Sequence, residues 1–197
     1  MVFRDWEEAY LNVPPWDVGI PQPAFVALAK DGEIRPGKVL DAGCGTGENA
    51  LMLARSGCTV TGIDIVESAI ENARSKAEKR KTEACFIVGN ALDMDQYFRE
   101  ATFDTVIDSG LFHAMSDEER PLYARQICWP LKPGGAYFLL CYSDREPGEW
   151  GPRRISRREI EETFGGLFHI RYIKESFFLT RAGTGRSHAY LLSAVKA

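Results

Sequence analysis

Strand-like and helix-like patterns alternate along this chain, and this alternation limits the possible folds more than any other feature of the sequence. Short apolar runs have the length of buried strands at residues 38–41, 59–63, 84–88, 105–107 and 136–142. Residues 48–56 and 67–81, which lie between them, instead carry apolar side chains at helical spacing. Strands joined in this way by right-handed helical crossovers form a parallel sheet that is covered on both faces.

The second half of the chain continues this pattern and then changes it. Two capping boxes predict further helix starts, at Ser116 with Glu119 and at Ser156 with Glu159. The C-terminal runs at residues 168–178 and 187–195 are typical of two strands that pair antiparallel. We therefore predict one α/β domain over residues 1–197. Its sheet is expected to be Rossmann-like and doubly wound, mostly parallel, with an antiparallel C-terminal strand.

A glycine-rich loop at residues 43–47 lies between the first strand and its helix, with Asp41 before it and Glu48 after it. Glycines allow a sharp turn and a close approach of backbone amides to a ligand. The spacing is G-x-G-x-G, not the G-x-G-x-x-G of dinucleotide sites, and no Gly-Lys-Ser/Thr follows. Two flanking carboxylates would repel a pyrophosphate but suit an ammonium or sulfonium group. The alternative is a merely tight strand-to-helix turn.

Asp64 ends the second strand, 17 residues after Gly47. A carboxylate at this place accepts hydrogen bonds from both ribose hydroxyls of a nucleoside. With no arginine nearby, it favours a free 2′-hydroxyl over a 2′-phosphate. The alternative is a strand-end carboxylate that caps the next helix. Together with the loop, Asp64 predicts a nucleoside site at the carboxyl ends of the strands.

Composition narrows the classes of function. The formal net charge of −4 gives no global attraction to nucleic acid or to an anionic membrane. No apolar run approaches the roughly 18 residues that span a bilayer, and residues 1–10 lack the apolar core of a signal peptide. The five cysteines form no C-x-x-C pair, so we expect buried free thiols, no metal site and a cytoplasmic location.

Several motifs together resemble the class I S-adenosylmethionine-dependent methyltransferases over nearly the whole chain. They are VLDAGCGTG at 39–47, the acid of TGID at Asp64, GNAL at 89–92, FDTVIDSGLFH at 103–113 and LKPGG at 131–135. The resemblance implies S-adenosylmethionine as the cofactor, S-adenosylhomocysteine as its product, and a methyl acceptor as the second substrate.

The N-terminus has a narrower resemblance, to the thiopurine, halide and thiol methyltransferases. Its W-E-x-x-Y and P-W-D-x-G motifs place Trp6, Tyr10 and Trp16 at that group's aromatic positions. The resemblance implies that residues 1–25 form a lid over the cofactor, where aromatic rings favour a sulfonium by cation–π contact. Packing of the same rings on the core is the structural alternative.

The resemblance also assigns residues to the methionine part of the cofactor. Asp41 would lie near its amino group. Asp108 and Ser109, at the end of the fourth strand, would contact it by backbone or side chain. The loop glycines would lie against it: Gly43, Gly45 and Gly47.

The nucleoside part is assigned in the same way. Asp64, with Ile65 beside it, would hold the ribose, and Ala91 and Leu92 would flank the adenine. Asn90 would accept a hydrogen bond from the exocyclic amine. It departs from the family, in which many relatives have aspartate, but an amide oxygen accepts the same bond.

Methyl transfer is an in-line displacement, so positioning of the acceptor supplies most of the acceleration. A thiolate or halide needs no strong base, whereas a phenol or amine benefits from one. His113 is the candidate base, with Phe112 expected on the crevice side. The alternative is that His113 only caps the helix that follows it.

The loop at residues 143–155 is where this fold places an acceptor lid, and Trp150 is a candidate part of that lid. An arginine here would pair with an acidic substrate, although we favour the interpretation that these arginines form a solvent-exposed basic face at the start of a helix. For His188, a place in the core or at the rim is the commoner alternative. Six residues are candidate substrate contacts: Phe112, His113, Tyr142, Arg153, Arg154 and His188.

The sequence thus predicts an enzyme that methylates an S, O, N or halide atom of a small molecule and acts as a monomer or homodimer. One alternative is a nucleic-acid or protein methyltransferase, but the Asn/Asp-Pro-Pro-aromatic signature is absent at residues 108–111, and no basic domain is appended. A non-catalytic S-adenosylmethionine-binding protein is the second. A nicotinamide-dependent oxidoreductase, disfavoured by the glycine spacing and Asp41, is the third.

Overall fold

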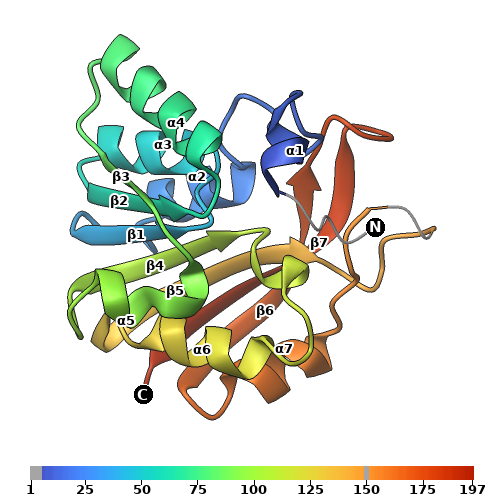
Figure 1. The fold of residues 1–197 in the computed structure, drawn as a ribbon. Helices are drawn as coiled ribbons and strands as arrows, with labels where there is room; N and C mark the ends of the chain where they lie inside the picture. The colour runs from blue at the N-terminus through green and yellow to red at the C-terminus, as the bar shows by residue number, and fades with distance from the viewer. Residues whose placement is uncertain (1–5, 149–150) are drawn as a thin grey trace.

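The computed structural model describes residues 6–148 and 151–197. Its centre is a seven-stranded sheet in the order β3-β2-β1-β4-β5-β7-β6 (Figure 1). The strands are β1 (Lys38–Ala42), β2 (Thr59–Asp64), β3 (Cys85–Val88), β4 (Phe103–Ser109), β5 (Leu131–Tyr142), β6 (Phe168–Leu179) and β7 (Arg186–Lys196). β1 to β5 pair in parallel, whereas β7 runs antiparallel to both β5 and β6. The predicted fold class is confirmed.

Helices cover both faces of the sheet (Figure 1). One face carries α2 (Pro23–Lys30), α3 (Glu48–Arg55) and α4 (Glu67–Lys79), and the other carries α5 (Met94–Tyr97), α6 (Arg120–Cys128) and α7 (Arg157–Phe164). The remaining helices of the described residues are short: α1 (Trp6–Tyr10), η1 (Ala91–Asp93) and η2 (Phe112–Ala114).

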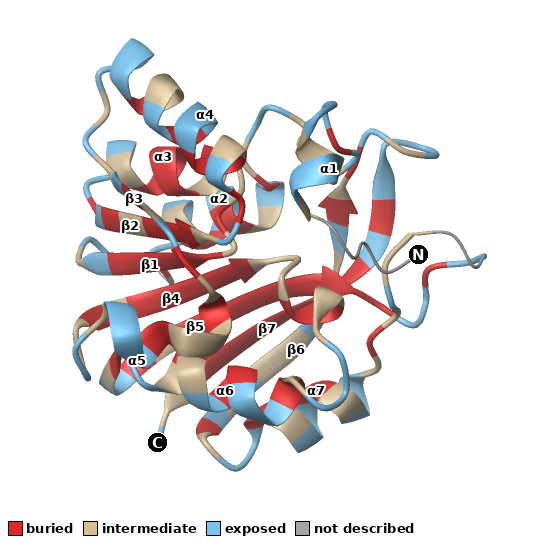
Figure 2. Ribbon diagram, viewed as in Figure 1, coloured by how far each residue is buried: buried red, intermediate tan, exposed pale blue. Residues whose placement is uncertain are grey.

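β5 shows why the sheet is buried on both faces. Along this strand Phe138 and Leu140 pack into the core under α2 and α3, and the alternate residues Tyr137 and Leu139 pack into the core under α6 and α7. All four side chains are fully buried, as the colouring of the central strands in Figure 2 shows. Strands of this kind read as continuous apolar runs because successive side chains point to opposite, equally covered faces.

The two capping boxes have different outcomes. Ser156 and Glu159 cap α7 reciprocally, as predicted. Ser116 and Glu119 also form both bonds of the predicted box, from the Ser116 amide to Glu119 Oε2 at 2.8 Å and from the Glu119 amide to Ser116 Oγ at 3.3 Å, but α6 begins only at Arg120. The prediction that this helix starts at Ser116 is therefore wrong, because these bonds close a turn before the helix.

The remaining sequence predictions concern thiols and membranes. All five cysteines are free, and Cys44, Cys58 and Cys141 are buried as expected, whereas Cys85 is exposed and Cys128 is half-buried. Within residues 6–148 and 151–197, no group of three or more His, Cys, Asp or Glu side chains is placed to hold a metal. Over the same residues, every helix is too short or too polar to traverse a bilayer.

Candidate active site

A cavity of about 710 Å³ opens at the carboxyl ends of β1, β2 and β4. The strand order reverses between β1 and β4, which is the switch point where open α/β sheets bind ligands. The volume lies within the roughly 300–1,000 Å³ of small-molecule sites. The end at the loop 43–47 and Asp64, where the sequence analysis expects the cofactor, is called the cofactor end below. The end at His113, Tyr142 and Phe178, near the residues expected to contact the substrate, is called the acceptor end.

The glycine loop has a backbone that only glycine adopts freely. Gly43, Gly45 and Gly47 have φ of +69°, +51° and +82°. A Cβ on Gly45 would lie 2.8 Å from the Tyr10 hydroxyl, and one on Gly47 would lie 2.9 Å from the Phe86 ring. Residues with a side chain are strained at such φ, and a side chain at residue 45 would also collide with Tyr10 on the cavity wall. The loop is thus a cradle built for close approach of a ligand to the backbone.

Asp64 lies on the cavity wall and braces this loop. Its Oδ2 accepts the amide hydrogen of Gly45 at 2.8 Å, and its Oδ1 accepts that of Val66 at 3.0 Å. Burial raises the pKa of the carboxyl, and the hydrogen bonds from Val66 and Gly45 oppose this rise. The bond to Val66 closes a turn before α4 and does not cap that helix, whose N-cap residue Val66 has no side-chain cap bond. Each oxygen keeps a lone pair for a ligand, and the neighbouring Ile65 also lines the cavity.

Asp41 lies elsewhere than the family role implies. It is fully buried, lies outside the lining of the cavity, and neither of its carboxylate oxygens has a hydrogen-bond partner. Burial, with the charges of Asp108 and Asp64, raises its pKa to about 8, and the nearby Ala50 backbone, which forms no hydrogen bond with it, offsets this rise only in part. At neutral pH this side chain is therefore mainly protonated.

Asp108 is also fully buried but is richly bonded. It accepts hydrogen bonds from the amides of Leu111 and Phe112 at 2.7 and 3.0 Å, and from the hydroxyls of Tyr123 and Tyr137 at 2.6 and 3.4 Å. Burial raises its pKa to about 6 against these bonds. Asp108 does not line the cavity, although its neighbour Ser109 does. Asp108 thus fixes the turn after β4.

The predicted adenine contacts are not brought to the cavity. Asn90, Ala91 and Leu92 are outside its lining. Asn90 Oδ1 already accepts the Leu92 amide hydrogen at 2.9 Å and so caps η1. The role of these three residues stays a prediction.

His113 lies at the acceptor end, half enclosed by aromatic rings. Its Nδ1 accepts the amide hydrogen of Tyr142 at 3.1 Å, and its ring centre is 5.0 Å from that of Tyr142 and 6.0 Å from that of Phe178. Burial, with the charges of Arg154 and Arg120, lowers its pKa to about 3. The imidazole is therefore neutral and weakly basic, which disfavours the base role. Its Nδ1 is bonded to Tyr142, and α6 has no side-chain cap bond, which disfavours the helix-capping alternative.

Two predicted substrate contacts lie away from the cavity. Phe112 is fully buried, stacked 6.1 Å from Tyr123 and 5.0 Å from Phe164 between the ring centres, because η2 turns it into the core. The expectation that it faces the crevice is corrected. His188 is exposed and packs on Phe177 at 5.3 Å, because strand alternation turns it from the cavity.

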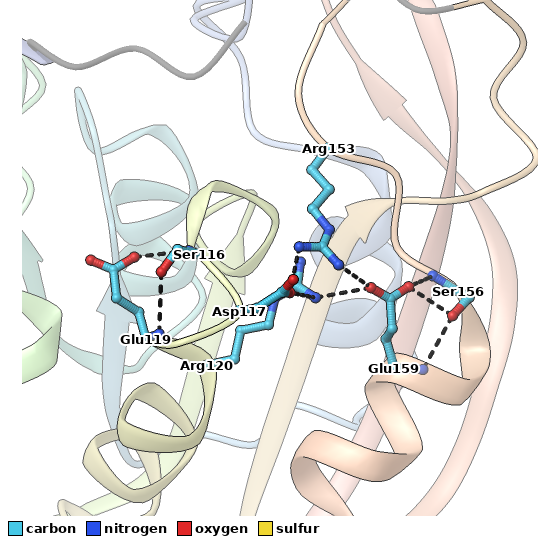
Figure 3. Close-up of polar contacts among 7 residues, drawn as sticks. All are labelled: Ser116, Asp117, Glu119, Arg120, Arg153, Ser156 and Glu159. Atoms are coloured by element: carbon cyan, nitrogen blue, oxygen red, sulfur yellow. Dashed lines mark hydrogen bonds and ion pairs between the residues drawn. The ribbon is translucent and has the colours of Figure 1, made fainter.

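The acceptor-side loop is tied down by charge. Arg153 lines the cavity and pairs with Asp117 and with Glu159, which also binds Arg120 at 2.9 Å (Figure 3). Despite partial burial, the Ser156 and arginine contacts lower the Glu159 pKa to about 2.

Arg154 does not line the cavity. It donates to the Pro152 carbonyl at 2.7 Å and lies 5.7 Å from the centre of the Tyr142 ring. Tyr142 itself lies on the cavity wall. Trp150 lies outside the described residues.

The N-terminal aromatic residues all line the cavity. The indole N–H of Trp16 donates to the Tyr10 hydroxyl at 3.1 Å, and the Trp6 and Trp16 rings meet edge-on at 5.9 Å. The rings therefore pack on one another and face the cavity at once. Asp17, which the sequence analysis did not single out, accepts a hydrogen bond from the Thr46 hydroxyl at 2.9 Å.

Phe178 was also missed. It lies on β6, 65 residues beyond His113, and nothing in its local sequence marks it as a cavity residue. Asp17 stands inside the P-W-D-x-G motif, so its position in that motif was the available signal.

Comparison with known proteins assigns the family. Residues 39–135 match a family described as "Methyltransferase domain". The chain is 31% identical to probable thiol methyltransferase 2 of Arabidopsis thaliana, over 80% of this chain and 70% of that protein. The chain belongs to the class I S-adenosylmethionine-dependent methyltransferases. Their methyl donor is S-adenosylmethionine, and the glycine cradle with Asp64 at its edge fits such a group.

Two further relatives of this methyltransferase are 38% identical to it. One is 2-heptyl-1-hydroxyquinolin-4(1H)-one methyltransferase of Mycobacteroides abscessus, aligned over 76% of this chain and 66% of that protein. The other is a solved structure titled "Conversion of a Disulfide Bond into a Thioacetal Group during Echinomycin Biosynthesis", with a TM-score of 0.84 over 93% of this chain and 85% of that one.

Proposed function

We propose that this chain transfers the methyl group of S-adenosylmethionine to a nucleophilic atom of a small, largely apolar acceptor. One observation carries the proposal. A single cavity joins the glycine cradle and Asp64 at one end to the His113, Tyr142 and Phe178 rings at the other. A donor and an acceptor bound at these two ends would meet inside one enclosure, as an in-line displacement requires.

The bound cofactor would supply an activated methyl group on a sulfonium. In the proposal, the backbone of the loop 43–47 and the carboxylate of Asp64 hold the nucleoside and methionine parts. Trp6, Tyr10 and Trp16 cover this end, exclude water and present ring faces that favour a positive charge. We extend the proposal to residues 1–25 as the lid over the cofactor.

At the acceptor end, the chain's contribution is position and desolvation. Tyr142 and Phe178 supply flat apolar walls, with ring centres 5.3 Å apart. Arg153, tied to α6 and α7, supports the proposal that residues 143–155 close this end. Because His113 is a poor base, the acceptor is expected to lose its proton readily without help, as a thiol or an acidic hydroxyl does.

The named relatives support a small-molecule acceptor, since one acts on a hydroxyquinolone and another is a probable thiol methyltransferase. The cavity supports it too, because carboxylates of Asp117, Glu118 and Glu119 at its acceptor side would repel a nucleic-acid backbone. A cytoplasmic location and a monomeric or homodimeric state also remain proposals.

Calorimetric titration with S-adenosylmethionine, S-adenosylhomocysteine and NAD tests the cofactor site. We expect micromolar binding of the two sulfur compounds and none of NAD. Asp64→Ala should weaken binding about a hundredfold, because a charge-assisted bidentate contact is lost. Asp104→Ala is the matched control, because Asp104 pairs with Lys132 outside the cavity. Equal affinities of the two variants would remove Asp64 from the site.

Transfer itself is measured with methyl-labelled S-adenosylmethionine and a panel of thiols, phenols, N-hydroxy heterocycles and halides. Label in any of these acceptors supports the proposal. Tight cofactor binding without transfer to any of them would favour a non-catalytic binding protein.

A further inference from the structure

The acceptor end of the cavity presents one unused hydrogen-bond donor. Because His113 Nδ1 accepts from the Tyr142 amide, the neutral ring carries its hydrogen on Nε2. Nε2 has no partner among the described residues, yet it does not belong to their unpartnered polar atoms that are fully buried, so it is accessible. It therefore meets the open space of the cavity that His113 lines. A donor left free on a cavity wall is a contact for a ligand.

The surroundings of this donor are flat. Tyr142 and Phe178 are both buried, their ring planes inclined at 41°, and the His113 ring meets Tyr142 edge-on. Leu111 and Met115 add apolar surface on the same side. Rings so arranged bind a planar aromatic molecule by stacked and edge-on contacts.

The charges at the acceptor end disfavour anionic ligands. Among the described residues that line the cavity, Arg153 is the one basic side chain, and it already pairs with Asp117 and Glu159. Two further carboxylates, of Glu118 and Glu119, line this end of the cavity. An anion here would meet these carboxylates, and the one basic side chain in the described lining is already paired, so an uncharged ligand is favoured.

Building on the proposed function, we propose that the methyl acceptor is an uncharged planar aromatic molecule that carries a carbonyl oxygen, an N-oxide oxygen or a ring nitrogen. His113 positions this molecule by donating its Nε2–H to that oxygen or nitrogen. In the transfer, the nucleophilic atom of the methyl acceptor forms the new bond to the methyl carbon, and the sulfur keeps the electron pair of the broken bond. The acceptor's proton leaves to water. His113 takes no proton and is a positioning residue.

Two variants of His113 separate a positioning role from a structural one. In His113→Asn the side-chain oxygen replaces Nδ1 as partner of the Tyr142 amide, but no donor reaches the position of Nε2. In His113→Gln the amide nitrogen takes the position of Nε2, but the Tyr142 amide loses its partner. His188→Asn is the matched control, because His188 is exposed and outside the cavity.

Binding is measured with S-adenosylhomocysteine present, using quinolin-4(1H)-one as the probe. We expect His113→Asn to raise the Kd of the quinolone about tenfold, because one hydrogen bond is lost. The Kd of His113→Gln should stay within about threefold of the wild-type value. Indole, which is planar but lacks an acceptor atom, should bind all three proteins alike. A structural role predicts the reverse order, with only the Gln variant impaired, and that result would overturn the proposal.

Imidazole NMR gives a readout without turnover. At pH 7 His113 should be in the Nε2–H form, and its Nε2–H resonance should move when the quinolone binds. A resonance that does not move would contradict the proposed contact.

Anion probes complete the test and keep the two proposals apart. The 3-carboxylate of the quinolone and thiocyanate should bind at least tenfold more weakly than the quinolone itself. Preferred binding or methylation of either anion would overturn this inference and leave methyl transfer standing. Failure to bind S-adenosylhomocysteine at all would instead overturn the proposed function.

Discussion

The cofactor end and the acceptor end of the cavity are built in different ways. At the cofactor end, Asp64 binds backbone amides that lie 19 and 2 residues away, and the loop takes left-handed φ at its glycines. At the acceptor end, His113, Tyr142 and Phe178 come from three separate elements, and ion pairs of Arg153 hold the rim. One end depends on backbone shape and the other on side chains gathered from distant segments. Substitutions should therefore act differently at the two ends.

Gly45→Val should have the largest effect on function. Its Cβ would lie 2.8 Å from the Tyr10 hydroxyl at a φ of +51°, so the side chain fills the cradle. We expect cofactor affinity to fall at least about a thousandfold, or about 4 kcal/mol, in a protein that still folds. Affinity is measured by calorimetry and folding by circular dichroism.

Gly134→Val is the matched control for backbone strain. Gly134 also has a positive φ, of +72°, but a Cβ there meets nothing within 4 Å, and it lies outside the cavity. This variant should lose stability from the strained φ and bind the cofactor normally. Similar binding by both variants would contradict the backbone description of the cofactor end.

Asp41→Asn should change the pH dependence of stability. Because the folded-state pKa is raised to about 8 from an ordinary 3.8, folded protein holds a proton that unfolded protein has lost. Asp41 therefore makes wild type less stable as pH rises from about 4 to about 8. In the absence of cofactor, the free energy of unfolding of the variant relative to wild type should rise by about 3 kcal/mol between pH 5 and pH 8.

Denaturant unfolding at the two pH values measures this difference. Asp104→Asn is the control, because the contacts with Lys132 and Lys38 lower the pKa of Asp104 and its titration ends below this window. Parallel pH curves for Asp41→Asn and wild type would mean that Asp41 is ionised in the folded protein.

Tyr123→Phe should sharpen the contrast between Asp41 and its bonded neighbour Asp108. It removes a buried 2.6 Å hydrogen bond to Asp108, and we expect a loss of about 2 kcal/mol in the free energy of unfolding. Tyr137→Phe, whose bond to the same oxygen is 3.4 Å long, should lose less. Cofactor affinity should stay nearly unchanged in both, because Asp108 lies outside the cavity. A large loss of affinity would instead make Asp108 a direct cofactor contact.

The same contrast explains how much the sequence predicts. The sheet, the glycine loop and Asp64 are predicted because contiguous apolar runs and one short motif form them. The acceptor end is predicted only in part, because burial decides it. Phe112 and His113 are neighbours in sequence, yet η2 turns one into the core and leaves the other on the cavity. Phe178 reaches the cavity through strand pairing that no local pattern reveals.

Arg153→Met tests the acceptor rim and should have the smallest effect on stability. Arg153 is 40% exposed, and Glu159 keeps Arg120 as a partner when Arg153 is lost (Figure 3). Because solvent screens the pair, we expect a change of less than about 1 kcal/mol in the free energy of unfolding. KM for the acceptor should rise about threefold as the loop loosens, with cofactor affinity unchanged. Steady-state kinetics with the best acceptor measures KM for the acceptor and for the cofactor. Arg158→Met is the control, because it breaks an exposed ion pair with Glu162 outside the cavity lining. If both arginine variants leave KM unchanged, the ion pairs of Arg153 do not position the loop, and the acceptor end relies on its buried rings alone.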